Sequence, residues 1–125
     1  MPAKLWIGIA VGGGIGASLR YIIIVLIVSE GFPFASLTAN LIGCFLLPYI
    51  LLLPNVDPDV KKMIGTGVIG SFTTFSTFSV ESIELLQSGQ IFFFFTYFMI
   101  SLLGGIGLSA LSYRWMVMRN RGVQG

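Results

Sequence analysis

Residues 5–28 read LWIGIAVGGGIGASLRYIIIVLIV, and Arg20 is the only charged residue among them. A helix of about 20 mostly apolar residues crosses the roughly 30 Å of hydrocarbon in a bilayer, so this stretch is long enough to span a membrane. Three further apolar stretches follow at 34–53, 63–86 and 91–113, and none has the alternating pattern of a barrel strand. The sequence therefore predicts an all-α membrane protein, with four transmembrane helices in a single transmembrane domain over residues 1–125.

The composition excludes most other classes of protein. Hydrophobic residues make up 55% of the 125 residues and charged residues 10%, whereas charged residues are about a quarter of a typical soluble domain. The net charge of +2 is too small to indicate nucleic-acid binding. The chain has no His and a single Cys, so it lacks the commonest metal ligand and the usual general base. We expect no enzymatic activity, no organic cofactor and no nucleic-acid partner.

The basic residues outside the four stretches predict an orientation. They are confined to the two ends of the chain and the middle loop, namely Lys4, Lys61, Lys62, Arg114, Arg119 and Arg121, while loops 29–33 and 87–90 carry none. The positive-inside rule then places both termini in the cytoplasm. The expected location is the cell inner (plasma) membrane, which the chain crosses several times, with the lipid bilayer as a partner.

The first stretch contains small residues at regular spacing and one charge within the membrane. Gly8, Gly12 and Gly16 recur every four residues, which lets another helix approach closely, and packing is the favoured interpretation. Arg20 costs about 2.5–3.5 kcal/mol at the centre of a bilayer. It either places a positive charge in a water-filled vestibule or extends along the helix to the headgroups.

Hydrogen-bonding groups also occur in the second and fourth stretches. Asn40 has two N–H donors that must find partners, and a link between helices is the simplest explanation. In the fourth stretch, Tyr97, Ser101, Gly105 and Ser109 recur every four residues and form a stripe of hydroxyls and small groups. Close packing of helices accounts for such a stripe without any further function.

The densest pattern is GVIGSFTTFSTFS at 67–79, where hydroxyls and phenylalanines alternate. Gly70 is followed by β-branched threonines, which disfavour a regular helix, so we expect a break near the middle of this span. Unwound backbone is tolerated at that depth only inside protein or beside a polar cavity. Its freed carbonyls can hold a monovalent cation such as Na⁺.

The groups inside the membrane suit an anion better than a cation. Phe72, Phe75 and Phe78 share a helix face, which favours packing from the spacing alone, although the positive edge of a phenyl ring can face an anion. The other groups are hydroxyls, one amide and one Arg, with no carboxylate deep in a span. Weak hydrogen-bond donors without a strong fixed charge favour a path that conducts the ion over a site that holds it, because a conducted ion must be released.

Nearly from end to end, the sequence resembles the Fluc (CrcB) family of small fluoride channels. The resemblance is carried by GGIGASLRY at 13–21, NLIGCF at 40–45 and GVIGSFTTFSTF at 67–78, in this order on the first three stretches. It implies a passive, fluoride-selective anion channel that exports cytoplasmic fluoride. It further implies a dimer of two antiparallel subunits, with two fluoride pores at their interface.

The resemblance also implies roles for particular residues. Phe75 and Phe78 would form a box of ring edges, and Asn40 would donate its amide to fluoride. The remaining implied positions are hydroxyl donors at Ser76 and Thr77, a polar track with Tyr97 and Ser101, a charge at Arg20 in the vestibule, and a structural Na⁺ held by the backbone carbonyls of Gly70 and Thr73.

The sequence departs from the family pattern in three ways, and the third of them leaves the partner open. Pro48 stands where the family often has Gly. Gly105 stands at the third position of the hydroxyl track, and the basic residues are lopsided, whereas single-gene members insert both ways up with little bias. The partner is therefore either a second copy of the chain or an oppositely oriented paralogous subunit. The alternative functions are a small multidrug-resistance-type proton-coupled exporter, which needs a Glu in the first helix where this chain has Arg20, and a non-conducting membrane assembly subunit.

Overall fold

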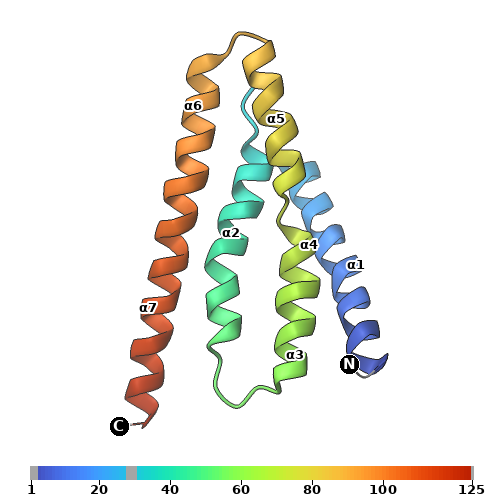
Figure 1. Ribbon diagram of the computed structural model, residues 1–125, viewed down its shortest axis with the longest axis vertical. Helices are drawn as coiled ribbons and strands as arrows, with labels where there is room; N and C mark the ends of the chain where they lie inside the picture. The colour runs from blue at the N-terminus through green and yellow to red at the C-terminus, as the bar shows by residue number, and fades with distance from the viewer. Residues whose placement is uncertain (1–2, 28–30, 125) are drawn as a thin grey trace.

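The computed structural model describes residues 3–27 and 31–124, and the regular structure in this part of the chain is helical. In chain order the elements are α1 (Ala3–Leu26), α2 (Phe34–Leu51), α3 (Pro58–Lys62), the π-helical η1 (Met63–Ile69), α4 (Gly70–Phe72), α5 (Phe75–Gln87), α6 (Ile91–Met99), the π-helical η2 (Ile100–Gly104) and α7 (Gly105–Gln124). They join into four helical paths, which are α1, α2, helix three (α3–η1–α4–α5) and helix four (α6–η2–α7) (Figure 1). The predicted number of helices is confirmed.

Helix three differs from the other paths because it is broken near its middle. The other three contain segments long and apolar enough to cross a membrane, at Ala3–Leu26, Phe34–Leu51 and Ile91–Gly122. In helix three, α4 ends at Phe72 and α5 begins at Phe75, with extended backbone between them. The predicted break is confirmed, and it lies at the two threonines rather than at Gly70.

The helix boundaries depart from the predicted ranges. The first helix was expected over 5–28 and is observed over 3–26, with residue 28 outside the described part, and the second ends at Leu51 rather than Leu53. Helix three starts at Pro58 instead of Met63, because the Asp57 side chain accepts a 2.8 Å hydrogen bond from the Asp59 N–H and caps the helix.

Helix four continues well beyond its predicted end at Tyr113, as far as Gln124. The basic tail was expected to be polar and outside the span, and the structure makes it helical. Asn120 explains part of this extension, because its side-chain N–H donates a 2.8 Å hydrogen bond to the carbonyl of Leu52, just past the end of α2. The tail is thus fixed against α2 rather than released into water.

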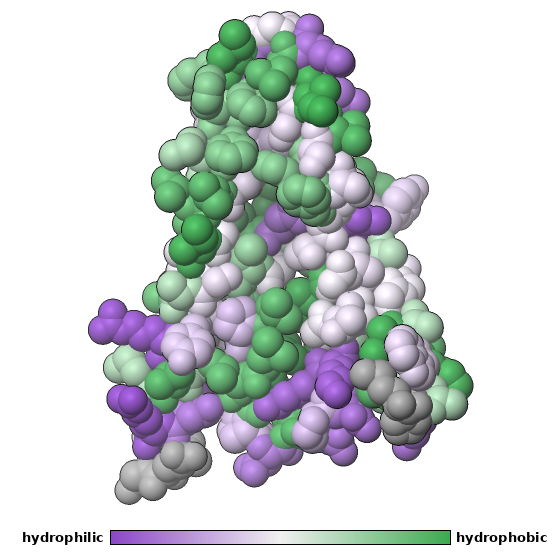
Figure 2. Space-filling model, in the orientation of Figure 1, coloured by the Kyte–Doolittle hydropathy of each residue, from purple (hydrophilic) through white to green (hydrophobic). Residues whose placement is uncertain are grey.

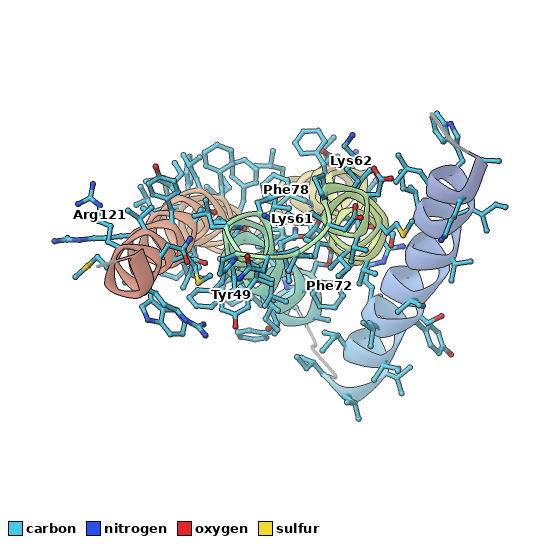
Figure 3. The ribbon with its side chains drawn as sticks, turned by 90° about the horizontal axis from the view of Figure 1, so that it is seen from below. Tyr49, Lys61, Lys62, Phe72, Phe78 and Arg121 are labelled. Carbon is cyan, nitrogen blue, oxygen red and sulfur yellow. The ribbon has the colours of Figure 1, made fainter. Side chains whose placement is uncertain are left out.

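The four paths pack side by side, with α1 and helix four at opposite sides of the molecule (Figures 1 and 3). α1 packs chiefly against η1 and α4, and α2 packs chiefly against α7. Gly12 and Gly16 are buried where α1 meets helix three, and a Cβ atom at Gly12 would lie 2.6 Å from the Met63 carbonyl oxygen. The close packing predicted from the glycine spacing is confirmed.

One end of the molecule gathers the two termini, the α2–α3 loop and most of the hydrophilic surface (Figures 1 and 2). Lys61, Lys62 and Arg121 all lie at this end, which faces the viewer in Figure 3. The opposite end holds the turn between α5 and α6. The charge asymmetry in the sequence is therefore also an asymmetry of the folded subunit.

The interior is small and the outer surface is apolar. A buried cluster of Phe32, Leu37, Leu85 and Tyr97 joins α2, α5 and α6. Many large apolar side chains are more than half exposed in the single chain, among them Trp6 on α1 and Leu103 on helix four. Such a surface requires either lipid or a partner subunit to cover it.

Candidate functional site

The break in helix three is a two-residue stretch of extended backbone. Thr73 has φ −84° and ψ 159°, and Thr74 has φ −150° and ψ 121°. The helical run from Pro58 to Phe72 ends at the break, and α5 starts immediately after it. The carbonyl end of one helix and the N–H end of the next therefore meet here, and they carry partial charges of opposite sign.

Asn40 on α2 holds the break through two hydrogen bonds to one residue. The Thr74 N–H donates to Asn40 Oδ1 at 2.8 Å, and Asn40 Nδ2 donates to the Thr74 carbonyl at 3.1 Å. This pairing satisfies the exposed peptide of the extended segment, much as a neighbouring strand would. The partner that the sequence demanded for Asn40 is thus the backbone of helix three, although one of its two amide N–H groups stays available.

The threonine hydroxyls at the break have separate partners. Thr74 Oγ1 accepts a 3.1 Å hydrogen bond from the Thr77 N–H and so caps the start of α5. Thr73 Oγ1 donates to the Ile69 carbonyl at 3.1 Å, within its own helical turn. The methyl group of Thr73 lies against Gly43 on α2, where any Cβ atom would collide with it.

A groove of about 520 Å³ runs along one side of the subunit beside the break. Six of the predicted site residues line it, namely Asn40, Gly70, Thr73, Phe75, Phe78 and Ser101. The other lining residues are Gly43, Cys44, Leu47, Gly65, Ile69, Thr74, Phe98, Leu102 and Ser109. No charged side chain belongs to this lining, so the polarity of the groove comes from an amide, hydroxyls and backbone.

The two phenylalanines of the predicted box lie side by side at the groove. The ring centroids of Phe75 and Phe78 are 6.2 Å apart. Phe75 is 81% exposed in the single chain, whereas Phe78 lies between Phe75 and the ring of Tyr97, whose centroid is 5.0 Å away. Figure 3 shows Phe78 near the middle of the subunit in the view along its length.

Four predicted residues lie outside the groove. Tyr97 is fully buried behind Phe78. Ser76 and Thr77 lie in the first turn of α5, next to the lining residues but not among them. Arg20 is partly exposed on α1, a helix that contributes no residue to the groove.

Several buried hydroxyls in helix four lack a hydrogen-bond partner in the described part of the chain. They include Tyr97 Oη and Ser101 Oγ, one turn apart on adjoining segments of helix four. A buried polar atom without a partner costs free energy, so such atoms commonly meet a water, an ion or another subunit. Ser101 Oγ is therefore an unsatisfied donor at the groove, whereas Tyr97 Oη lies next to the side chains of Glu81 and Ser36.

Glu81 is the polar residue that the sequence analysis underestimated. The sequence predicts no carboxylate deep in a span, yet Glu81 Oε1 is buried in the subunit and has no hydrogen-bond partner among the described residues. Its neighbours include Ser36 on α2 and Tyr97. The signal was present in the sequence, because Glu81 continues the three-residue spacing of Phe75 and Phe78 on α5.

Comparison with known proteins bears on what this arrangement does. Residues 7–113, which include α2 and helix three in full and the greater part of α1 and helix four, match the family described as "CrcB-like protein, Camphor Resistance (CrcB)". The chain belongs to the CrcB family. The groove, the broken helix and the unsatisfied hydroxyls all lie within the part that matches.

Curated relatives within this range carry one name. A "Fluoride-specific ion channel FluC 1" from Desulfitobacterium hafniense (strain Y51) is 46% identical over 104 residues, which cover 79% of this chain and 91% of the relative. A "Fluoride-specific ion channel FluC" from Chlorobium phaeobacteroides (strain BS1) is 38% identical over 78% of this chain and 81% of its own length. One from Leptospira interrogans serogroup Icterohaemorrhagiae serovar copenhageni (strain Fiocruz L1-130) is 39% identical over 87% of this chain and 91% of its own. These CrcB relatives are named as ion channels and not as enzymes.

Proposed function

We propose that this chain is one subunit of a fluoride-specific channel that releases cytoplasmic fluoride passively. The names of its CrcB relatives support this function. The groove beside the break carries the proposal, because it brings ring edges, an amide and an unsatisfied hydroxyl together without a charged side chain. Neutral donors of this kind replace the water around a small anion and still let it leave.

Fluoride holds its hydration water tightly, so the path must offer substitutes at each step. The free N–H of Asn40 donates to the ion, while its other N–H stays on the Thr74 carbonyl. The edges of Phe75 and Phe78 present their positive hydrogens. Hydroxyls extend the path on both sides, from Ser76 and Thr77 in α5 and from Tyr97 and Ser101 in helix four, and Arg20 supplies a positive charge in the vestibule.

Two subunits in opposite orientations complete the path. The groove is open in the single chain, and the exposure of Phe75 leaves one face of its ring without a protein neighbour. An antiparallel second subunit covers this face and gives two equivalent pores at the interface. An inside-negative potential drives an anion outward through such a passive path by about 2.3 kcal/mol per charge for each 100 mV.

A structural Na⁺ fits the break in helix three. The N–H groups that would normally bond the Gly70 and Thr73 carbonyls are directed to Asn40 and to the Thr74 hydroxyl. Carbonyls at the end of a helix carry partial negative charge, which suits a monovalent cation. Gly70 is exposed in the subunit, so a second subunit can bring its own carbonyls to the same ion.

Fluoride efflux from liposomes tests the channel function. Purified protein should release fluoride along its gradient far faster than chloride, and a proton gradient should not drive the flux. Asn40→Asp should abolish conduction, because it places a negative charge in the path of the anion. Transport driven by the proton gradient would instead indicate the small multidrug-resistance-type exporter. The absence of any fluoride flux from a well-folded dimer would indicate a non-conducting membrane assembly subunit.

The identity of the partner requires a separate measurement. The lopsided basic residues favour a fixed orientation, and therefore an oppositely oriented paralogous subunit over a second copy. The chain expressed alone should then give little stable dimer and little flux, and co-expression with the partner should restore both. A well-behaved homodimer that conducts fluoride contradicts obligate pairing and leaves the channel function intact.

A further inference from the structure

Thr74 redirects two backbone N–H groups at the break. In an uninterrupted α-helix, the Thr74 N–H would donate to the Gly70 carbonyl, and the Thr77 N–H would donate to the Thr73 carbonyl. Here the first donates to Asn40 Oδ1 at 2.8 Å, and the second donates to Thr74 Oγ1 at 3.1 Å. The two carbonyls that lose their helical hydrogen bonds in this way, those of Gly70 and Thr73, are the two carbonyls of the proposed sodium site.

The two diversions depend on Thr74 in different ways. The first diversion uses the backbone of Thr74. Its N–H donates to the Asn40 side chain, and its carbonyl accepts from the same side chain. The second uses the hydroxyl, which only a few residue types can supply at this position. The hydroxyl of Thr73 is oriented the other way along the chain, where it donates to the Ile69 carbonyl within the preceding turn.

We infer that Thr74 is the positioning residue of the cation site, although it offers no ligand itself. Its hydroxyl keeps the Thr77 N–H away from the Thr73 carbonyl, and its peptide, held by Asn40, keeps the Gly70 carbonyl free. The same Asn40 amide lines the groove, so one side chain joins the proposed anion path to the cation site. This inference rests on the sodium site described under the proposed function and adds the residue that creates it.

An ordinary helix cap predicts a different result from a positioning residue. A cap stabilises α5 to the same extent with and without Na⁺. A residue that frees a carbonyl changes how much Na⁺ the protein needs for the same stabilisation, because a ligand stabilises the folded state by mass action. The dependence of stability on Na⁺ concentration therefore separates the two roles.

The experiment titrates NaCl against purified full-length protein and follows the thermal unfolding midpoint, with N-methyl-D-glucamine chloride keeping ionic strength constant. The wild-type midpoint should rise with Na⁺ and not with the organic cation. Thr74→Ser keeps the hydroxyl and should behave as wild type. Thr74→Val has the same shape without the hydroxyl, and it should need at least about ten-fold more Na⁺ for the same rise in midpoint.

Thr96→Val is the control, because it makes the same change of side chain at a threonine whose hydroxyl donates to the Phe92 carbonyl within α6, away from the break. Its Na⁺ dependence should equal that of wild type, and an equal weakening there would refute the inference. Should Thr74→Val fail to fold, Thr74→Gly replaces it, since glycine is tolerated at helix caps and also lacks the hydroxyl.

The possible results separate the role of Thr74 from the sodium site and from the channel function. A wild-type midpoint that does not respond to Na⁺ removes the sodium site and this inference with it, while fluoride efflux tests the channel independently. A sodium response that is the same in wild type and Thr74→Val refutes the role of Thr74 alone. A weaker response in the valine variant, retained by serine, supports it.

Discussion

Gly43 and Thr73 meet at the point where α2 supports the extended backbone of helix three. The methyl group of Thr73 occupies the space that a side chain at position 43 would fill. A glycine at this position therefore sets how closely the break approaches Asn40, one turn earlier on α2. The position of the proposed ion path depends on this absent side chain as much as on the groups that line it.

Gly43→Ala should destabilise the protein by roughly 1–3 kcal/mol, because the added methyl collides with the Thr73 methyl group and displaces it. Denaturant or thermal unfolding in detergent measures the change. Gly14→Ala is the control, since a Cβ atom at Gly14 meets nothing within 4 Å. We expect that control to be neutral or slightly stabilising, because alanine favours a helix over glycine by about 0.5–1 kcal/mol. Equal losses in both variants would contradict the packing argument.

Phe75→Ile and Phe78→Ile should each reduce fluoride flux while the protein still assembles. Isoleucine fills much of the same volume but has no aromatic edge, and a loss of about 1.4 kcal/mol in stabilising the ion corresponds to a ten-fold lower rate. Liposome efflux measures the rate, and size-exclusion chromatography checks the assembly. Phe95→Ile, at an exposed ring on α6 outside the groove, should leave the flux unchanged. Undiminished flux in both Phe75 and Phe78 variants counts against the aromatic box.

At the scale of elements, the inner half of α2 is held by side chains from its neighbours. Pro48 has no N–H, so the Cys44 carbonyl one turn earlier loses its helical donor. Ser109 on α7 supplies the missing bond and donates to that carbonyl at 2.8 Å. Lys61 Nζ donates to the Leu51 carbonyl at 3.0 Å, which caps the end of α2. A proline is thus accommodated through tertiary contacts.

Ser109→Ala should cost roughly 1 kcal/mol of unfolding free energy, because it leaves the part-buried Cys44 carbonyl without a donor. Ser112→Ala is the matched control one turn further along α7, where the hydroxyl is buried without a partner in the described part of the chain, and it should be neutral or stabilising. In a Pro48→Ala background, the new N–H satisfies Cys44, and the cost of Ser109→Ala should nearly vanish. A double-mutant cycle with no coupling between positions 48 and 109 would show that Ser109 acts otherwise.

The sequence predicts the elements better than it predicts their ends. Apolar length alone indicates four helices, and the threonine-rich stretch after Gly70 indicates the break. The place of the break depends on Asn40, a residue of another helix, so local propensity cannot locate it. The early start of helix three had a local signal in Asp57 and Pro58, which a hydropathy reading does not use. The length of α7 had none, because it depends on the contact between Asn120 and the end of α2.

At the scale of the whole molecule, some features of the candidate site follow from local sequence motifs and others from contacts between distant segments. The sequence identifies six lining residues of the groove through three separate motifs, and the fold brings them to one side of the subunit. It misses the burial of Glu81, because a carboxylate near the end of an apolar stretch normally reaches water. The link between helices predicted for Asn40 is present, and it commits half of the hydrogen bonding of that side chain to Thr74.

The distribution of basic residues over the folded subunit predicts a single orientation in the membrane. Lys4, Lys61 and Lys62 lie at the end that also carries the arginines of α7, and the turn at the other end offers only uncharged Gln87 and Gln90 between α5 and α6. A reporter fused to the C-terminus should therefore be found almost entirely on the cytoplasmic side. Changing the three lysines to glutamine and both glutamines to lysine should give a mixed or reversed orientation.

The corresponding lysine-to-arginine variant is the control, since it keeps every charge and should retain the wild-type orientation. A wild-type population divided between both orientations would contradict the prediction, and would mean that the chain can supply both members of an antiparallel pair. If the proposed antiparallel assembly forms, a uniform population instead requires that the opposite subunit come from another chain. The orientation assay thereby decides between the two kinds of partner before any flux is measured, because an antiparallel assembly cannot form from subunits that all insert the same way.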